Sequence, residues 1–253
     1  MNITIEPRSL RGRIQIPSSK SVGHRELICA AMADGTSVID GISQSEDIDT
    51  TCGVLRAFGV KIHTVPSSVA GRICIRVHGG MHIPPECTAD CGESGSTLRF
   101  LIPAALMQDC TVTFTGHGRL PKRPLGPYEQ IFDKKNILYH HGTDALPFTV
   151  RGRLTPGYYE LPGNVSSQFI SGLLFCLPLL GADSVIVPSA PVESEGYIRL
   201  TAVVMKKYGV IIEEEAGRLK IPGGQSYTPC RSTVEGDDSQ AAFWIAAGTM
   251  GGK

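Results

Sequence analysis

The chain repeats one plan three times, with a period of about 70 residues. Each unit opens with a loop rich in serine and glycine, which leads into a helix of small and apolar residues. A short β-branched strand, an amphipathic helix and two more strands follow. The apolar helices read LICAAMA, LIPAALM and FISGLLF. Because such helices have no polar face, each must be buried on every side.

The other elements of each unit face solvent on one side. The second helix carries its charges on one face, as in RLTAVVMKKYG, and the strands TVTFTG and KIHTV alternate apolar with polar residues. This alternation is typical of a sheet with one wet face. The three units therefore predict an α/β fold of approximate threefold symmetry. Three buried parallel helices lie side by side inside it, and sheets form the outer wall.

Charge and hydropathy exclude two classes of partner. The 253 residues include 24 Lys and Arg and 24 Asp and Glu, which argues against nucleic acid held by a broad basic face. The balance leaves room for a small anion bound by a few focused cations. The longest apolar stretch, FISGLLFCLPLLGA, is too short for a membrane span, and the N-terminus lacks the apolar run of a signal peptide. We expect a cytoplasmic protein with no membrane partner.

The eight cysteines do not form the pairs that metal sites use. None lies in a C-x-x-C motif. Cys87 and Cys91 enclose TAD, with His78 and His82 nearby, but zinc ligands usually come at tighter spacings. We expect reduced thiols and no metal.

Pairs of serines stand at the start of each predicted apolar helix. They are Ser19 and Ser21, Ser94 and Ser96, and Ser166 and Ser167. A helix start presents free N–H groups and about half a positive charge. Three parallel helices would therefore gather their starts into a site for phosphate or carboxylate. Capping alone is the alternative for each helix taken singly. The cations near these starts favour the anion site, and they are Lys20, Arg25, Arg99 and Arg123.

Three of these cations are candidates for direct contact with an anion. Lys20 precedes a helix start, where a cation opposes the helix dipole, so a purely structural role would be unfavourable there. Arg25 lies one turn into the same helix, and its alternative is a surface ion pair. Arg123 lies in GRLPKRPLGP, whose prolines would hold a guanidinium rigidly, although such a run is also typical of a solvated surface. Gln168, at the third helix start, could donate an amide hydrogen bond.

A fourth unit begins at VEGDDSQAAFWIAAGTMGGK, with the same polar loop and small-residue helix. The strand predicted ahead of Lys20 likewise lacks an obvious partner. We therefore expect residues 1–19 to hold a strand of another domain and residues 20–235 to form a complete three-unit substrate-binding domain. Residues 236–253 would start a second domain that is mostly missing. The residues alone thus predict a binder of small polyanionic metabolites.

Six motifs extend this prediction. They are SKSVGHR, GESGSTLR, PKRPLGP, VSSQFISGLL, SEGYIRLT and VEGDDSQAA. In this order they resemble the motifs of the 5-enolpyruvylshikimate-3-phosphate synthases, also called 3-phosphoshikimate 1-carboxyvinyltransferases, over essentially the whole chain. The resemblance implies an inside-out α/β barrel of two domains with three repeats each. One of those domains is built from the extreme N-terminus and the C-terminal half, so the chain resembles a member that stops after its first complete domain.

The resemblance also implies an activity. The family transfers the carboxyvinyl group of phosphoenolpyruvate to the 5-hydroxyl of shikimate 3-phosphate and releases phosphate, on the route to chorismate and the aromatic amino acids. No metal or organic cofactor is implied. The expected partners are these two small molecules, and we expect a monomer.

Site residues follow from the same resemblance. Lys20 resembles the lysine that meets both substrates, and it is the one candidate catalytic residue. The residues that resemble contacts to shikimate 3-phosphate are Lys20, Ser21, Arg25, Ser166, Ser167, Gln168, Ser194 and Tyr197. Those that resemble contacts to phosphoenolpyruvate are Lys20, Gly95, Arg123 and Gln168. A side chain at Gly95 would crowd the ligand.

Two residues depart from the family's pattern. His24 stands where many relatives have asparagine, and Glu93 adds a negative charge to the glycine loop, where asparagine is frequent. The family's acidic proton-transfer residues lie beyond Lys253, so no general acid or base is assigned. We expect the chain alone to be inactive or nearly so, with weak binding of shikimate 3-phosphate.

Other functions stay open at this point. The sister enzyme, UDP-N-acetylglucosamine 1-carboxyvinyltransferase, shares the fold but has a reactive loop cysteine and an asparagine after its lysine. Here Ser21 follows Lys20, and GHGRLPKRPLGP has no cysteine. A non-catalytic half-barrel that only binds or dimerises is the alternative from another class. A relative of the RNA-processing cyclases fits poorly with zero net charge.

Overall fold

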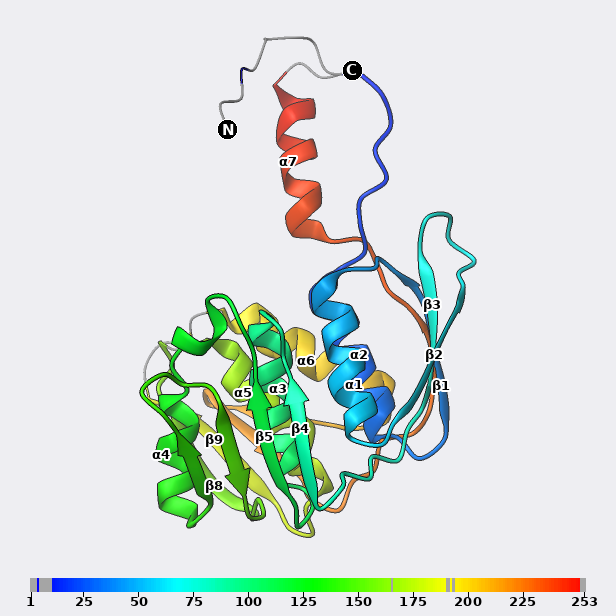
Figure 1. The fold of residues 1–253 in the computed structure, drawn as a ribbon. Coiled ribbons are helices and arrows are strands. Elements are labelled where there is room, and N and C mark those ends of the chain that lie inside the picture. The colour runs from blue at the N-terminus through cyan, green and yellow to red at the C-terminus, as the bar shows by residue number, and fades with distance from the viewer. Residues whose placement is uncertain (1–3, 5–10, 165, 190–191, 193, 251–253) are drawn as a thin grey trace.

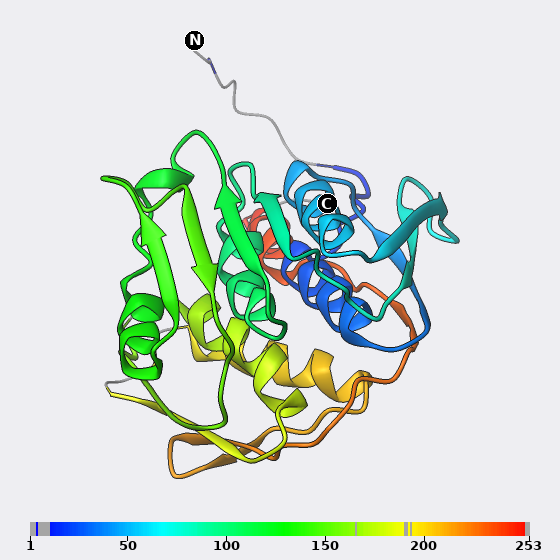
Figure 2. The same ribbon diagram turned by 60° about the horizontal axis from the view of Figure 1, so that its bottom comes forward.

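Three four-stranded sheets surround a set of packed helices (Figures 1 and 2). The computed structural model describes residues 4, 11–164, 166–189, 192 and 194–250. Figure 2 shows the helices in the interior, with the sheets on three sides of them. The prediction of an inside-out α/β fold with buried helices and outer sheets is confirmed.

The elements follow the predicted threefold plan. The first unit comprises α1 (Lys20–Met32), β1 (Thr36–Ile42), α2 (Glu46–Ala57), β2 (Lys61–Pro66) and β3 (Ile73–His78). The second comprises β4 (Glu86–Asp90), α3 (Gly95–Ala105), β5 (Thr111–Thr115), η1 (Leu120–Lys122), α4 (Gly126–Lys135), β6 (Leu138–His141) and β7 (Phe148–Arg151). The third comprises β8 (Gly157–Leu161), α5 (Ser167–Cys176), η2 (Leu177–Leu179), β9 (Ser184–Pro188), α6 (Glu195–Lys207), β10 (Glu213–Glu215) and β11 (Arg218–Ile221). β12 (Arg231–Thr233) and α7 (Asp238–Thr249) follow.

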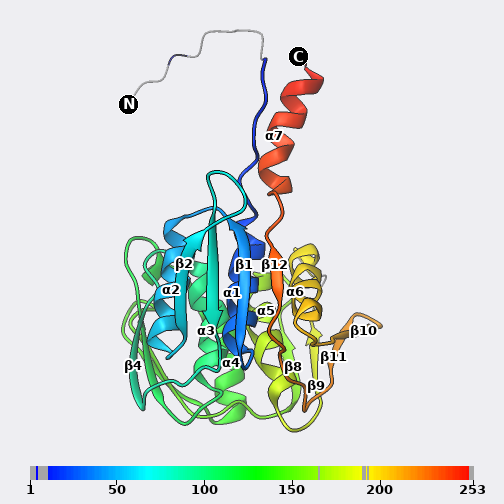
Figure 3. The ribbon, with the colours of Figure 1, turned by 90° about the vertical axis from the view of Figure 1, so that its right-hand side faces the viewer.

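Each sheet contains one strand that the sequence pattern did not reveal. β4 and β8 come just before the serine-rich loops of their units, and they pair parallel with β5 and β9. Among residues 11–19, the described stretch just ahead of α1, the first unit has no such strand. Instead β12 pairs parallel with β1 (Figure 3). The sheet orders are β12-β1-β3-β2, β4-β5-β7-β6 and β10-β11-β9-β8. The end of the third unit therefore completes the sheet of the first, which closes the threefold arrangement.

Burial follows the two predicted classes of helix. Every residue from Val22 to Ala31 in α1 is buried, as is every residue from Phe169 to Cys176 in α5. α3 is buried except at Ser96 and Arg99. Only one face of α6 is buried, and β5 buries alternate residues. The all-round apolar helices thus form the core, and the amphipathic elements cover them.

α1 and α2 run parallel, because residues that lie further along α1 contact residues that lie equally further along α2. Lys20 of α1 contacts Asp47 of α2, and four residues further along each helix His24 contacts Thr51. The first turns of these helices therefore lie at one end of the body.

α3 and α5 run parallel in the same way. Ser96 contacts Gln168 in their first turns, and Arg99 and Pro103 lie against Gly172 in the turn that follows. A β-carbon on Gly172 would stand 2.4 Å from the carbonyl oxygen of Arg99, so only glycine allows this approach.

α7 stands apart from the three-unit body (Figure 1). None of its residues is buried. Phe243 and Ile245 are largely exposed, as is Met250 directly after the helix. Among residues 11–19 the structure has one β-bridge, from Ser18 to Gly236. Residues 1–3 and 5–10 lie outside the described residues, so the strand predicted within 1–19 and the domain boundaries stay predictions. None of the described helices is long and apolar enough to cross a bilayer.

Glu26 joins the third unit to the first. Its side chain on α1 is fully buried and accepts hydrogen bonds from Lys207 Nζ at 3.0 Å, Tyr208 Oη at 2.8 Å and Ser232 Oγ at 2.9 Å. Lys207 and Tyr208 lie at the end of α6, and Ser232 lies on β12. One carboxylate therefore holds together the elements that close the threefold arrangement.

We expect Glu26→Ala to lower the free energy of unfolding by about 3 kcal/mol, because it leaves buried donors without an acceptor. Glu160→Ala is the matched control, since Glu160 pairs with Lys134 at 3.4 Å on the surface. Its loss should be below about 1 kcal/mol. Urea unfolding followed by circular dichroism measures both values. If both variants lose the same free energy of unfolding, Glu26 does not stabilise the contact of α1 with α6 and β12.

Candidate functional site: the starts of the central helices

A serine caps the start of each apolar helix. Ser19, Ser94 and Ser166 accept hydrogen bonds from the backbone N–H groups of Val22, Thr97 and Gln168, at 3.4, 3.3 and 3.4 Å. All three serines therefore act as N-caps, as the alternative interpretation of the sequence predicted. The other N–H groups of each first turn still point out of the helix end, so capping and anion binding are compatible here.

Arg25 is a buried cation that no carboxylate neutralises within the described residues. Its side chain is 2% exposed. Nε donates to Thr201 Oγ1 at 2.7 Å, and the two terminal nitrogens donate to the carbonyl oxygens of Ser21 and Tyr197. The guanidinium also lies 5.0 Å from the centre of the Phe100 ring. Burial lowers the pKa of Arg25 to about 10, so it stays charged at neutral pH.

Three predicted residues line one cavity beside Arg25. Ser21, Ser194 and Tyr197 lie around a space of about 420 Å³ between the first turns of α1 and α6. Asp237 and Asp238 form part of its far wall. The cavity thus has hydroxyl donors on one side and carboxylates on the other.

A second group gathers around the start of α3. A β-carbon on Gly95 would stand 2.5 Å from a terminal nitrogen of Arg123, so the guanidinium occupies the space that glycine leaves. Arg99 donates to Gln168 Oε1 at 2.8 Å, and Gln168 Nε2 donates to Ser96 Oγ at 2.8 Å. Gln168 therefore bridges the starts of α3 and α5.

The surroundings of Arg99 show that the residues around the start of α3 carry an uncompensated positive charge. Burial, and next the neighbouring Arg123, lower the pKa of Arg99. Its Nε is buried and has no hydrogen-bond partner within the described residues. Two close guanidinium groups without a carboxylate repel one another, and an anion between them would relieve that repulsion.

The other predicted residues are placed as follows. Lys20 is half exposed and lies 2.5 Å from Asp47, so its charge is paired across to α2. Ser166 is exposed, and Ser167 is buried in the first turn of α5, next to Gln168. Glu93 lies 3.7 Å from His117 and against Gly118, whose φ of +62° suits glycine. The negative charge of Glu93 therefore faces the loop that leads to Arg123.

Sequence reasoning left some of these residues without a role. Arg99 was noted as a nearby cation but not assigned to a substrate, although it lies one turn into its helix as Arg25 does. Asp47, the partner of Lys20, was missed. So were Thr51, Thr97 and Thr201, whose hydroxyls are buried among the helix starts. Their signal was weak, because threonine inside an amphipathic pattern looks like an ordinary helix residue.

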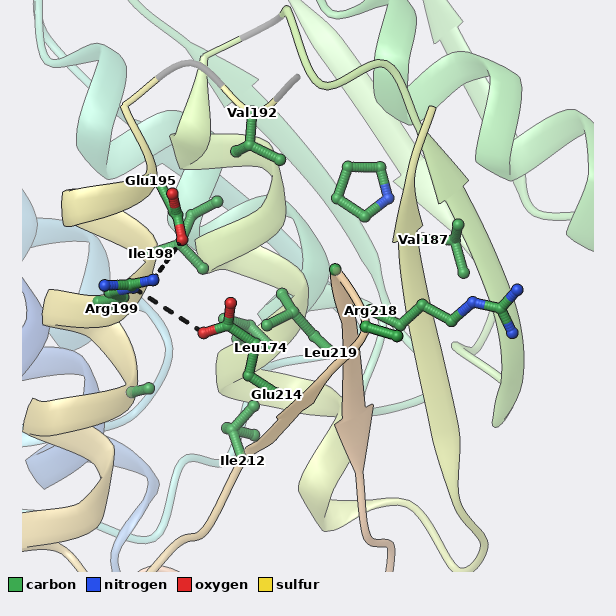
Figure 4. Close-up of a pocket in the computed structure, with 14 residues that line it drawn as sticks. Leu174, Val187, Val192, Glu195, Ile198, Arg199, Ile212, Glu214, Arg218 and Leu219 are labelled. Carbon is green, nitrogen blue, oxygen red and sulfur yellow. Dashed lines mark hydrogen bonds and ion pairs between the residues drawn. The ribbon is translucent and has the colours of Figure 1, made fainter. Parts of the chain in front are cut away.

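One further cavity and the thiols lie apart from this site. A cavity of about 480 Å³ lies on the outer side of α6, where Arg199 stands between Glu195 and Glu214 above Leu174 and Leu219 (Figure 4). It contains none of the gathered cations. All eight cysteines are free thiols. Within the described residues no group of three or more His, Cys, Asp or Glu side chains could hold a metal ion.

Known proteins share this architecture. The family model for EPSP synthase (3-phosphoshikimate 1-carboxyvinyltransferase) matches residues 5–253. A 3-phosphoshikimate 1-carboxyvinyltransferase of Clostridium acetobutylicum is 44% identical over 253 residues, which is 99% of this chain and 58% of that protein. One from Clostridioides difficile is 40% identical and covers 99% and 59%. The chain thus spans about 58% of the length of the curated relatives it matches.

A solved structure agrees with the sequence comparisons. EPSP synthase from Acinetobacter baumannii superposes with a TM-score of 0.79 at 25% identity, over 94% of this chain and 52% of that one. The threefold arrangement, the gathered helix starts and the match of the family model along the chain all agree. The chain belongs to the EPSP synthase (3-phosphoshikimate 1-carboxyvinyltransferase) family.

Proposed function

We propose that the protein carrying this chain transfers the carboxyvinyl group of phosphoenolpyruvate to the 5-hydroxyl of shikimate 3-phosphate. The 5-hydroxyl oxygen adds to C2 of phosphoenolpyruvate as the hydroxyl loses its proton and a proton adds to C3. The bond from C2 to the phosphate oxygen then breaks while C3 loses a proton, so that phosphate leaves and the C2–C3 double bond forms again. The observation that carries the proposal is the pair of arginines at the helix starts, the buried Arg25 and the half-buried Arg99. Neither has a carboxylate partner among the described residues.

The two groups at the helix starts suit two anions. In the proposal, Ser21, Arg25, Ser194 and Tyr197 contact shikimate 3-phosphate beside the cavity between α1 and α6. Ser166 and Ser167 bind its phosphate at the start of α5. A phosphate at a helix start meets free N–H groups and the positive end of the helix dipole.

Phosphoenolpyruvate is assigned to the second group. Gly95, Arg123 and Gln168 contact it, and Arg99 adds a further positive charge. Lys20 lies at the start of α1 and contacts both substrates once its ammonium exchanges Asp47 for a ligand. Its role is to stabilise negative charge in the adduct formed between the two substrates.

The cations make the reaction possible by offsetting repulsion between the substrates. Two phosphorylated molecules repel one another at bonding distance, and fixed cations on both sides reduce that cost. Holding them in reacting geometry adds the advantage of proximity. No cofactor is required for these steps. That the protein is a cytoplasmic monomer without a cofactor stays a prediction.

The test is the choice of acceptor by the gene product that carries this sequence. With phosphoenolpyruvate as donor, we expect phosphate release with shikimate 3-phosphate and none with UDP-N-acetylglucosamine. Mass spectrometry should find 5-enolpyruvylshikimate 3-phosphate. Turnover of the UDP-sugar would instead identify the sister activity. Binding of shikimate 3-phosphate by calorimetry without any turnover would identify a binding module.

We expect Gly95→Ala to weaken the apparent affinity for phosphoenolpyruvate by about 10-fold or more, because the added methyl group displaces the guanidinium of Arg123. The affinity for shikimate 3-phosphate should change far less. Gly53→Ala in α2 is the control, since a β-carbon there meets no atom within 4 Å. If Gly95→Ala and Gly53→Ala give the same KM for phosphoenolpyruvate, Arg123 is not a ligand.

A further inference from the structure

A buried chain of hydrogen bonds runs from α1 through α2 to the cap of α3. His24 Nδ1 lies 2.8 Å from Thr51 Oγ1, and Thr51 Oγ1 lies 2.6 Å from Thr97 Oγ1. Thr97 Oγ1 donates to Ser94 Oγ at 2.7 Å. All four side chains are 2% exposed or less, so solvent does not compete for these bonds. We call His24, Thr51, Thr97 and Ser94 the relay.

Counting protons along the relay fixes the state of His24. Each threonine hydroxyl has a single proton. The proton of Thr97 goes to Ser94, so Thr51 must donate to Thr97. Thr51 then has no second proton to donate to the imidazole, so His24 must donate from Nδ1 to Thr51 Oγ1. The ring therefore carries a proton on Nδ1. Burial lowers the pKa of His24 to about 4, so the ring is neutral at pH 7.

The other ring nitrogen indicates that His24 is not there for packing. Nε2 is buried and has no hydrogen-bond partner within the described residues. An unpaired buried acceptor costs stability, and the neighbouring Phe100 ring would suit an apolar side chain equally well. The histidine thus has an energetic disadvantage in the core that its bond to Thr51 must offset.

The far end of the relay lies at the start of α3, beside the residues that the proposed function assigns to phosphoenolpyruvate. Ser94 caps α3 by accepting from the backbone N–H of Thr97, and Gly95 and Ser96 follow it directly. Gly95 lies against Arg123, and Ser96 accepts from Gln168. A shift of Ser94 would therefore move both contacts.

The near end of the relay lies in the turn of α1 whose residues the proposed function assigns to shikimate 3-phosphate. His24 lies between Lys20 and Arg25 on α1, one turn after the first and directly before the second. The side chains of Lys20 and His24 also pair with α2 four residues apart, at Asp47 and Thr51. The relay thus joins the turn that holds Lys20 and Arg25 to the turn that holds Gly95.

We propose that His24, acting through Thr51 and Thr97, is a positioning residue that sets the start of α3 relative to the start of α1, and so the spacing of the two substrates. The proposal rests on the proposed function for its effect on substrates. The hydrogen-bond chain itself can be tested without any ligand.

Thr51→Val and Thr51→Ser form a matched pair for the test. Valine keeps the shape and removes the hydroxyl, whereas serine keeps the hydroxyl. In the gene product that carries this sequence, calorimetry with phosphoenolpyruvate should give a Kd at least fivefold weaker for Thr51→Val than for Thr51→Ser, with Thr51→Ser within twofold of the parent. If Thr51→Val does not fold, His24→Leu against His24→Asn gives the same comparison, because asparagine can still donate to Thr51.

Nitrogen-15 spectra separate failure of the relay from failure of the proposed function. The parent should show His24 protonated at Nδ1 only, and Thr51→Val should shift the amide signals of Gly95 and Ser96 while Thr51→Ser leaves them in place. A parent with its proton on Nε2, or equal spectra and equal Kd values for the two variants, overturns the proposal. A parent that binds no phosphoenolpyruvate counts against the proposed function, and the spectra alone then decide on the relay.

Discussion

The side-chain hydrogen bonds among the first two turns of α1, α2, α3, α5 and α6 form a closed ring, and the geometry of the site depends on it. His24 reaches Thr51 on α2, Thr51 reaches Thr97 on α3, and Ser96 on α3 reaches Gln168 on α5. Ser171 on α5 then reaches Thr201 on α6, which accepts from Arg25 on α1. Apolar packing alone allows parallel helices to slide along one another, whereas directed hydrogen bonds between their side chains fix their register.

This ring explains how like charges can be gathered at the end of a folded domain. Arg25 is held by carbonyl and hydroxyl oxygens and by the Phe100 ring, none of which neutralises it. Arg99 is held by Gln168 in the same manner. The protein thus stabilises the position of each guanidinium while leaving its charge available. Sites of this kind favour anions, because a ligand supplies the negative charge that the fold withholds.

Local patterns in the sequence predicted much of the fold. Helices that are apolar on all sides, such as residues 169–176, were predicted to be buried, and the serines at the helix starts predicted the caps. The pairs that close the structure could not be found in this way. β12 joins β1 across the whole length of three units, and Arg25 meets Thr201 at a separation of 176 residues. Periodicity of 2 or 3.6 residues describes which face of an element is buried, but it carries no information about distant partners.

The central claim is that the starts of α1, α3 and α5 form one site for anions. The most direct measurement is a titration of the nitrogen-15-labelled chain with shikimate 3-phosphate and phosphoenolpyruvate together, followed through the backbone amide signals. The account predicts that the amides of residues 19–21, 94–96 and 166–168 shift together and report the same affinities. Shifts confined to one helix start, or spread over exposed lysines remote from all three, would contradict it.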